Sequence, residues 1–205
     1  SQTYSNIEYI IIDGKSTDTT IDICHKYKDQ IHTIVTESDK GLYDAMNKGV
    51  ALATGDIVGV LNADDFYAND EVLTKVVREF TTHNIDGLYA DLVYVDAIET
   101  SKVTRTWISG AYKENAFLKG WMPPHPTFFV KNECYQKFGN YSLELKSAAD
   151  YELMLRMIHK HKINLGYLPE VTVRMRVGGV SNSSLKNRLN ANKVDKRAWE
   201  MNGLK

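Results

Sequence analysis

The chain has 205 residues, 43% of them hydrophobic, a size that suits one α/β or α+β domain with a substantial core. Its 25 Lys and Arg residues balance 26 Asp and Glu residues, and the net charge of −1 argues against binding nucleic acid through bulk charge. No apolar run reaches the roughly 18 residues of a membrane span. We expect Cys24 and Cys134 to be reduced, as in a cytosolic protein.

Apolar runs alternate with amphipathic segments in the first part of the chain. The predicted order is strand 7–12, helix 16–29, strand 32–35, helix 42–53, strand 57–61 and helix 70–81. Ser16 or Thr17 is expected to cap the first helix. This alternation predicts a parallel sheet with right-handed crossovers, in which ligands bind at the carboxyl ends of the strands.

The pattern becomes more antiparallel after Asp86. Strands are predicted at 88–95, 103–107, 127–130, 165–168 and 171–177, and helices at 132–138, 150–161 and 181–201. No Pro/Gly-rich linker divides the chain, so a single domain is expected. The chain has no initiator Met and opens on a turn-like stretch, which suggests that an upstream piece has been removed or left out.

Asn62, Ala63, Asp64 and Asp65 end the apolar run 57–61 abruptly. Carboxylates at a strand end can hold Mg²⁺ or Mn²⁺, which take oxygen ligands and complete their shell with waters and substrate phosphates. The alternative is that an acid caps the next turn. The position at the end of a predicted parallel strand favours the functional interpretation.

Two further segments carry polar side chains with two interpretations each. Asp13 ends the first predicted strand, where it could accept a hydrogen bond from a base or a ribose, or form an Asx-turn with Gly14. Asp44 and Asn47 share one helix face, and Lys40 near the helix start opposes the helix dipole unless a phosphate binds there. An ordinary solvated first turn is the alternative.

Asp150 begins the helix predicted at 150–161. Asp is a favoured N-cap, so a cap is the simpler interpretation from local sequence. A carboxylate near a nucleotide can instead act as a general base, taking a proton from an attacking hydroxyl.

Three weaker signals lie in the second part of the chain. His125 stands between two prolines, so a rigid loop could hold it against a substrate or simply pack it. Arg174 and Arg176, with the glycine turn before Ser181, would suit a pyrophosphate, although a plain turn before a helix is equally compatible. The basic last helix could touch an anionic membrane or form a solvated face.

Several segments, taken in order and spacing, match known motifs. They are residues 2–8, 12–18, 39–49, 53–56, 61–65, and 149–153 with Arg156. Residues 2–8 resemble the Q-T-Y-x-N-x-E segment of family-2 glycosyltransferases, 12–18 their nucleotide-binding turn, and 39–49 their N-x-G-x-x-x-A-x-N-x-G segment. Residues 61–65, which 53–56 precede, resemble the metal-binding D-x-D region, and 149–153 with Arg156 resemble the E/D-D-x-x-L-x-x-R base motif. Family-2 glycosyltransferases are inverting enzymes with the GT-A fold, and the likeness is closest to bacterial members that build O-antigen, capsule or other exopolysaccharide.

The resemblance implies a role for each matching position. Asp13 would contact the base of a nucleotide-sugar, Asp64 would bind Mn²⁺ or Mg²⁺ at the diphosphate, and Asp150 would be the catalytic base. Further nucleotide-sugar contacts are expected at Asp39, Lys40, Asp44, Asn47, Asn62, Ala63 and Asp65. Acceptor or diphosphate contacts are expected at His125, Arg174, Arg176 and Ser181.

The resemblance also implies a fold and some departures from it. The expected fold is α/β, a Rossmann-like, mostly parallel sheet flanked by helices, with residues 1–95 binding the nucleotide-sugar and 96–205, more antiparallel, facing the acceptor. The family's first strand and helix have no counterpart before Ser1. Asp13-Gly14-Lys15-Ser16 stands where D-D-G-S is common, and Asn62 replaces the first acid of D-x-D, which weakens a two-acid metal site.

The expected activity is metal-dependent, inverting transfer of a sugar from a UDP-sugar to a hydroxyl of a saccharide or polyprenyl-diphosphate-linked acceptor. The expected place is the cytoplasm, with peripheral contact to the inner face of the plasma membrane. A sugar nucleotidyltransferase would need a Gly-rich phosphate loop, which this chain lacks. A catalytically degenerate saccharide- or nucleotide-binding scaffold would be favoured by loss of Asp64 and Asp150, yet both are present.

Overall fold

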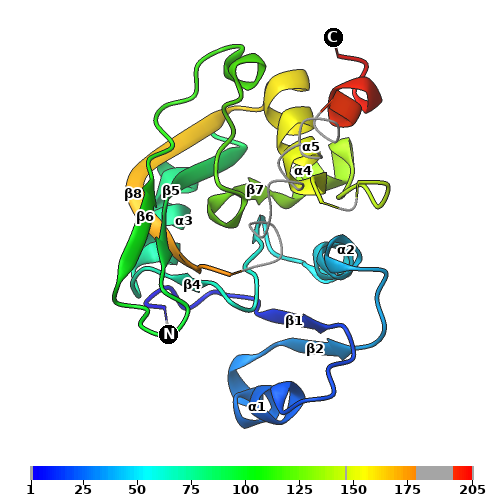
Figure 1. Cartoon of the computed structure of the whole chain (residues 1–205), viewed down its shortest axis with the longest axis vertical. Coiled ribbons are helices and arrows are strands. Elements are labelled where there is room, and N and C mark those ends of the chain that lie inside the picture. The colour runs from blue at the N-terminus through cyan, green and yellow to red at the C-terminus, as the bar shows by residue number, and fades with distance from the viewer. Residues whose placement is uncertain (1, 146, 179–195, 205) are drawn as a thin grey trace.

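The computed structural model of the protein describes residues 2–145, 147–178 and 196–204 (Figure 1). A two-stranded sheet lies at the bottom of this view, and a six-stranded mixed sheet flanked by helices forms the rest. This arrangement confirms the predicted α/β fold class. Within the described residues, no helix combines the length and the apolar character needed to cross a membrane.

The two-stranded sheet confirms the first predicted parallel pair. Strand β1 (Ile10–Asp13) pairs in parallel with β2 (Thr33–Thr36), and α1 (Thr20–Lys26) and the 3₁₀ turn η1 (Lys28–Gln30) connect them. Strand β1 comes from an apolar run, but its three isoleucines are only half-buried. The reason is that α2 (Leu42–Leu52) packs on β1, while no strand in the described part of the chain pairs with its second edge.

Two details of the predicted helices were wrong. The N-cap of α1 is Thr19 rather than Ser16 or Thr17, because Ser16 is engaged by Asp13 in the turn after β1. Helix α2 buries Met46 and Val50 as its pattern indicates, but Leu42, in the projecting first turn, is 57% exposed.

Helix α3 (Val72–Thr82) buries the apolar stripe that its spacing predicts. Val72 and Val76 are almost fully buried and pack in one cluster with Leu88 and Phe129 of the sheet. Leu73 and Phe80 line the margin of the same cluster, so α3 covers one face of the sheet.

The six-stranded sheet differs from the prediction in how its strands pair. Its order is β3 (Ile57–Gly59), β7 (Phe129–Lys131), β5 (Gly87–Val95), β8 (Leu165–Arg176) and β4 (Phe66–Tyr67), with β6 (Val103–Trp107) also paired to β5. The third predicted strand, β3, was expected to extend the parallel sheet, which is wrong. It pairs antiparallel with β7, because strand partners are chosen by tertiary packing that local sequence does not encode.

Strand β5 is the centre of the sheet, and all nine of its residues are buried. It runs parallel to β8 on one side and antiparallel to β6 and β7 on the other. The two strands predicted at 165–168 and 171–177 are one strand, β8. The pairing of β8 with β5 changes register between two pairs of opposed residues, Leu168 with Ala90 and Val171 with Asp91. Pro169, which has no N–H to donate, lies in this irregular stretch.

Helical segments pack against the sheet in the second half of the chain. They are the 3₁₀ turns η2 (Ala116–Lys119) and η3 (His125–Thr127), α4 (Asn132–Phe138), α5 (Ala149–Met154) and the π-helix η4 (Leu155–Lys160). The helix predicted at 132–138 is confirmed, whereas the one predicted at 150–161 divides into α5 and η4. Residues 196–201 are helical, and most of the predicted basic helix 181–201 lies outside the described residues.

Both cysteines are free and buried, in line with their predicted reduced state. Burial raises the pKa of the Cys134 thiol to about 11, so this side chain behaves as an inert core group.

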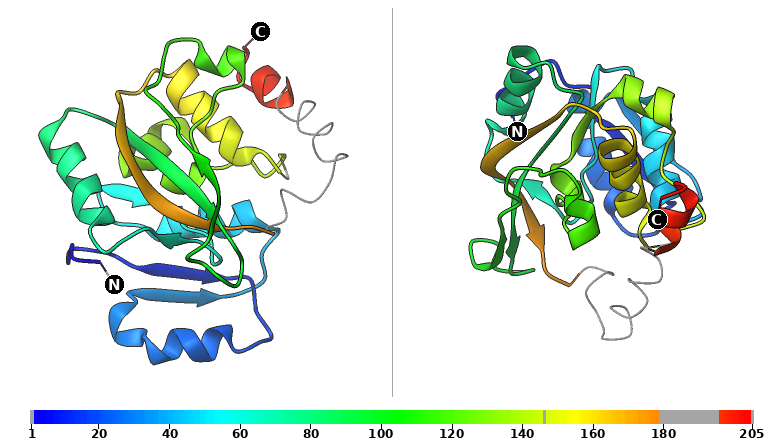
Figure 2. Two further views of the ribbon diagram at one scale, coloured as in Figure 1. Left: turned by 60° about the vertical axis from the view of Figure 1, so that its left-hand side comes forward. Right: turned by 90° about the horizontal axis from the view of Figure 1, so that it is seen from above.

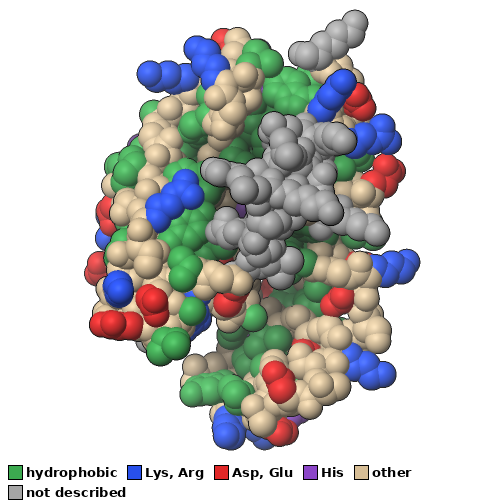
Figure 3. Space-filling model, in the orientation of Figure 1, with side chains coloured by type: hydrophobic (Ala, Val, Ile, Leu, Met, Phe, Trp, Pro, Cys, Tyr) green, Lys and Arg blue, Asp and Glu red, His purple; other side chains and the backbone are tan. Residues whose placement is uncertain are grey.

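The sheet joins the two halves of the chain. Strands β3, β4 and β5 come from residues 1–95 and β6, β7 and β8 from 96–205, so the halves share one core. Figure 2 shows the β1–β2 unit with α1 set apart from this sheet, and Figure 3 shows the surface narrowing between that unit and the larger body. The assignment of donor and acceptor roles to the two halves stays a prediction.

Candidate active site

The turn after β1 is built around the Asp13 side chain. Asp13 is buried, its Oδ2 accepts from the backbone N–H groups of Lys15 (3.1 Å) and Ser16 (3.0 Å), and the Ser16 hydroxyl donates to its Oδ1. Lys15 adopts a left-handed conformation with φ of 69°. The Asx-type turn that the sequence left open is therefore formed, and a contact between Asp13 and a nucleotide base stays a prediction.

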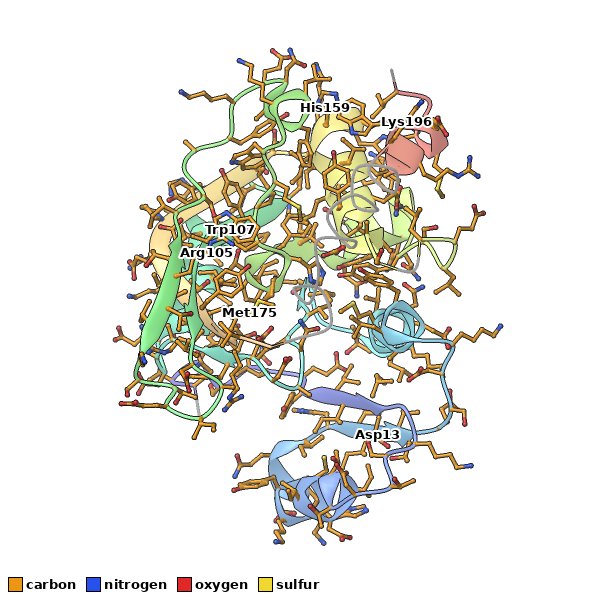
Figure 4. The ribbon with its side chains drawn as sticks, viewed as in Figure 1. Asp13, Arg105, Trp107, His159, Met175 and Lys196 are labelled. Atoms are coloured by element: carbon orange, nitrogen blue, oxygen red, sulfur yellow. The ribbon has the colours of Figure 1, made fainter. Side chains whose placement is uncertain are left out.

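A second predicted nucleotide contact, Asp39, lies directly against this turn. A Cβ added to Gly14 would crowd the Oδ2 atom of Asp39, so the end of the Asp39 side chain lies close to the backbone of this turn. The other Asp39 oxygen accepts from the N–H of Gly41 (2.8 Å). The fold thus brings the end of β1, where Figure 4 labels Asp13, together with the loop before α2.

Asp44, in the first turn of α2, binds the loop that precedes the helix. Its Oδ2 accepts from the backbone N–H of Lys40 (2.9 Å), and the same oxygen lies 3.7 Å from the Lys48 Nζ. Asp44 therefore organises the loop that carries Lys40. The Lys40 side chain is exposed, and its contact with a phosphate stays a prediction.

Asn47 holds α2 to the segment between α4 and α5. Its Nδ2 donates to the carbonyl of Tyr141 (2.9 Å), and its Oδ1 accepts from the N–H of the same residue (2.9 Å). The rings of Tyr43, one turn earlier, and Tyr141 are stacked with centroids 5.8 Å apart. These contacts give Asn47 a structural role, and its direct contact with a nucleotide stays a prediction.

We expect Asn47→Ala to lower the free energy of unfolding by about 1–3 kcal/mol, because the Tyr141 backbone groups lose their partner in a part-buried position. Urea unfolding followed by circular dichroism measures the change. Asn140→Ala, at an exposed position in the same connection, should stay within about 0.5 kcal/mol of the parent. Equal stability of the two variants would contradict the clamp.

Residues 62–65 form a tight polar turn shortly after β3. The N–H of Asp65 donates to the Asn62 carbonyl (3.1 Å), and the Asn62 Nδ2 donates to the Asp65 Oδ2 (3.1 Å). Asp65 is buried, and this burial raises the pKa of its carboxyl to about 6, against the effect of the Asn62 hydrogen bond. Ala63 and Asp64 are exposed, so the Asp64 carboxylate is free to face a ligand.

Two oxygens of this turn, the Oδ1 atoms of Asn62 and Asp65, are buried and have no hydrogen-bond partner among the described residues. Buried polar atoms are normally satisfied, so these oxygens make the turn a candidate place for a ligand or ion. Amide and carboxylate oxygens are the donors that Mg²⁺ and Mn²⁺ prefer. The described residues contain no cluster of three or more His, Cys, Asp or Glu side chains suited to a metal.

Arg176, at the end of β8, reaches this turn. Its Nη1 donates to the Asp64 carbonyl (2.6 Å), and its guanidinium lies 5.1 Å from the centroid of the Phe66 ring. Arg174 instead donates to the carbonyl of Thr100 (2.8 Å) in the β5–β6 connection, so the structure separates the two predicted arginines. Ser181, the third predicted residue of this group, lies outside the described residues.

Asp150 is the second residue of α5, and its side chain does not cap the helix. The N-cap is Ala148, whose carbonyl accepts from the Glu152 N–H (3.0 Å). The Asp150 Oδ1 accepts a hydrogen bond from the Tyr43 hydroxyl (3.0 Å). The cap interpretation is therefore wrong, and the role of general base stays a prediction.

His125 lies in a buried group beside Asp150. Its Nε2 is 2.8 Å from the Tyr141 hydroxyl, which is 3.3 Å from the Tyr135 hydroxyl. Burial lowers the pKa of His125, and the nearby Asp150 charge acts in the opposite direction. These contacts favour the packed-histidine interpretation, and substrate contact stays a prediction.

Strand pairing brings the polar turn and the His125 group to one end of the sheet. Gly59 opposes Phe129 in the antiparallel β3–β7 pair, so the chain leaving β3 towards Asn62 lies at the same end as the chain entering β7 from His125. Sequence reasoning did not single out Tyr43 or Tyr141. The signal available was the four-residue spacing of Tyr43 and Asn47, which puts both on one helix face.

Comparison with known proteins agrees with this geometry. The family model described as Glycosyl transferase family 2 matches residues 1–141. A PGL/p-HBAD biosynthesis glycosyltransferase of Mycobacterium bovis is 31% identical over 186 residues, which cover 89% of this chain and 70% of that protein. The chain therefore belongs to glycosyltransferase family 2, a family of transferases, which confirms the resemblance read from its motifs.

Solved structures support the GT-A fold. A fragment of TarS from S. aureus in complex with UDP matches with a TM-score of 0.69 and 19% identity, covering 96% of this chain and 58% of that one. The mannosyltransferase PcManGT from Pyrobaculum calidifontis, in complex with GDP-Man and Mn²⁺, matches with a TM-score of 0.66 and 15% identity, covering 98% and 56%. The chain thus spans little more than half the length of these two structures.

Proposed function

We propose that this chain transfers a sugar from a nucleotide-diphosphate sugar to a hydroxyl of a saccharide or lipid-linked saccharide, with inversion at the anomeric carbon. The observation that carries the proposal is the turn at 62–65, where two buried oxygens have no partner in the described part of the chain and lie next to the exposed carboxylate of Asp64. A ligand rich in charge and able to bring its own oxygen atoms, such as a diphosphate with a divalent cation, suits this turn.

Three residues of the turn would hold a cation. Asp64 would supply the exposed carboxylate, and the unpartnered Oδ1 atoms of Asn62 and Asp65 would support it from the buried side. When bound, Mn²⁺ or Mg²⁺ would neutralise the charge that develops on the leaving diphosphate. The solved neighbours bind UDP in one case and GDP-Man with Mn²⁺ in the other, which supports a nucleotide-sugar donor here.

Asp150 would act as the general base of the reaction. Its Oδ1 is engaged by the Tyr43 hydroxyl, so Oδ2 is the atom that takes a proton from the acceptor. The acceptor oxygen bonds to the anomeric carbon, the bond from that carbon to the diphosphate oxygen breaks, and the nucleoside diphosphate leaves. A single displacement of this kind passes through an oxocarbenium-like state, inverts the centre and needs no protein nucleophile.

Other chain segments would place the donor. Asp13 and Asp39, which lie together at the end of β1, are suited to the nucleoside, and Lys40 and Arg176 to the diphosphate. We place the reaction in the cytoplasm and in cell-surface polysaccharide or glycolipid biosynthesis. The mycobacterial relative is named for PGL/p-HBAD biosynthesis, and the acceptor of this chain stays part of the proposal.

Titration calorimetry tests the donor site directly. UDP, GDP and dTDP, each with and without Mn²⁺, are titrated into the protein and into an Asp64→Ala variant. We expect one nucleotide to bind only with Mn²⁺, and its affinity to fall at least tenfold in the variant because the exposed carboxylate ligand is gone.

The matched control for this experiment is Asp70→Ala, which removes an exposed acid near the turn without removing a turn oxygen. It should bind as the parent does. Binding that is equal with and without Mn²⁺ would contradict the proposed cation site. No binding of any of the three nucleotides would instead favour a degenerate scaffold.

A further inference from the structure

The strongest unassigned feature is a group of tyrosines around Asp150. Tyr141, from the segment before α5, contacts both Tyr43 of α2 and His125 of η3. Tyr43 alone among them is hydrogen-bonded to the carboxylate, at 3.0 Å from its Oδ1. The function proposed above uses Asp150 but leaves open what holds it.

The geometry of Tyr43 is set by neighbours on both sides. Asn47, one turn further along α2, fixes the helix to the Tyr141 backbone through two hydrogen bonds of 2.9 Å. The Tyr43 ring lies nearly parallel to the Tyr141 ring, with an interplanar angle of 19°. The Tyr141 hydroxyl is in turn anchored by His125. The Tyr43 hydroxyl therefore reaches Asp150 from a well-packed ring.

The protonation states fit a one-way hydrogen bond. Burial, together with the Asp150 charge, raises the pKa of Tyr43, so its hydroxyl keeps its proton and acts as the donor. A donor on Oδ1 restricts rotation of the carboxyl group and leaves Oδ2 as the acceptor of an incoming proton.

Helix α2 also carries the donor-side residues. Asp44 is next to Tyr43 and orders the loop of Lys40, and Asp39 in that loop lies against the turn after β1. A single helix thus places the predicted donor contacts at its start and the partner of the predicted base on its first turn.

We infer that Tyr43 is the positioning residue of the general base, orienting Asp150 through its hydroxyl and linking the base to the donor side through α2. The inference rests on the proposed function, because it assigns Tyr43 a task only if Asp150 is the base. The inference predicts that Tyr43 affects kcat and does not contact the nucleotide-sugar donor.

A spectroscopic experiment tests the contact without any substrate. The tyrosines are replaced by 3-fluorotyrosine, and the ¹⁹F signals of Tyr43 and Tyr167 are assigned by their loss in the Tyr→Phe variants. Tyr167 is the matched control, because its hydroxyl donates to a different carboxylate, Asp91 Oδ1, at 2.8 Å. Asp150→Asn should shift the Tyr43 signal and leave Tyr167 in place, and Asp91→Asn should do the reverse. A Tyr43 signal that does not respond to Asp150→Asn overturns the inference.

A kinetic experiment tests the role. Release of nucleoside diphosphate is followed from UDP-glucose, GDP-mannose or dTDP-glucose, whichever base the calorimetry selects, with water as the acceptor. Tyr43→Phe should lower kcat about tenfold, the loss expected for one hydrogen bond to a charged group, and leave the donor KM within about twofold. Tyr167→Phe should match the parent in both constants.

The two constants separate positioning from mere structure. If Tyr43 only supported α2, its loss would move Asp39, Lys40 and Asp44 and raise the donor KM as much as it lowers kcat, which overturns the inference. Parent-like kcat in Tyr43→Phe, with Asp150→Asn inactive, also overturns the inference and leaves the proposed function standing. Full activity in Asp150→Asn would show that Asp150 is not the general base. That result contradicts the proposed function as well as the inference, so it differs from a result that contradicts the inference alone.

Discussion

Replacing Asp150 with Asn should lower the rate of sugar transfer by about 100- to 10,000-fold, the usual contribution of a general base. The asparagine side chain is close to isosteric and can still accept the hydrogen bond from Tyr43, so the local geometry is expected to persist. What it loses is the ability of the Oδ2 position to take a proton. Initial rates with saturating donor measure the effect.

Nucleotide binding gives the internal check on this variant. Asp150→Asn should bind the nucleoside diphosphate and Mn²⁺ as the parent does, because the predicted cation site at 62–65 lies on a different segment. Glu144→Gln, which neutralises an exposed acid in the connection leading to α5, is the matched control and should keep full activity. An active Asp150→Asn variant would show that another group removes the proton.

Replacing Arg156 with Ala should lower the free energy of unfolding by about 3–5 kcal/mol, the cost of leaving a buried charge without its partner. Arg156 pairs with the nearly buried Glu152 through contacts of 2.8 and 3.0 Å. Its side chain and that of Glu152 are only 13% and 5% exposed. It also donates to the carbonyls of Gly139 and Asn140, at the end of α4.

Denaturant unfolding measures this loss, with Arg197→Ala as the control. Arg197 forms ion pairs with Glu144 and Glu200 at exposed positions, so its removal should cost no more than about 1 kcal/mol. Arg156→Lys keeps the charge but loses the two-pronged geometry, and it should fall between the two alanine variants. Equal losses in both alanine variants would contradict the structural role of the Arg156 pair.

Arg156 illustrates what motif likeness does and does not convey. The sequence placed Arg156 in the same motif as the predicted base, and the structure gives it a stabilising contact with Glu152 four residues earlier. Spacing predicts that two residues share a helix face. It does not say whether the pair serves the fold or the chemistry, because that depends on burial and on partners from other segments.

The elements themselves were largely predictable, since period and turn residues are local properties. The apolar stripe of α3 and the short helix α4 came directly from spacing. The antiparallel pairing of β3 with β7 did not, because a three-residue apolar strand carries no mark of its partner. The division of the last predicted core helix into α5 and the π-helix η4 was not predicted either, because the apolar spacing of Tyr151, Met154, Leu155 and Ile158 is compatible with an α-helix throughout.

The candidate site shows the same limit. Asp64 and Asp150 could be named from their motifs, but the link between Asp150 and Tyr43 joins residues 107 positions apart in the chain. Neither residue predicts the other from local pattern. The structural alternatives at Asp13 and Asp150 had different outcomes: Asp13 forms the Asx-type turn with partners within three residues, whereas Asp150 is no cap and its partner is on a distant helix.

The central position of β5 has a consequence for how the protein is made. Its nine buried residues pair with β6 and β7 on one edge and with β8 on the other, and β8 is synthesised last of these strands. At about 5–20 residues per second, several seconds of translation separate β5 from β8. During that time an apolar strand with a free edge is exposed, which is the situation that chaperones relieve.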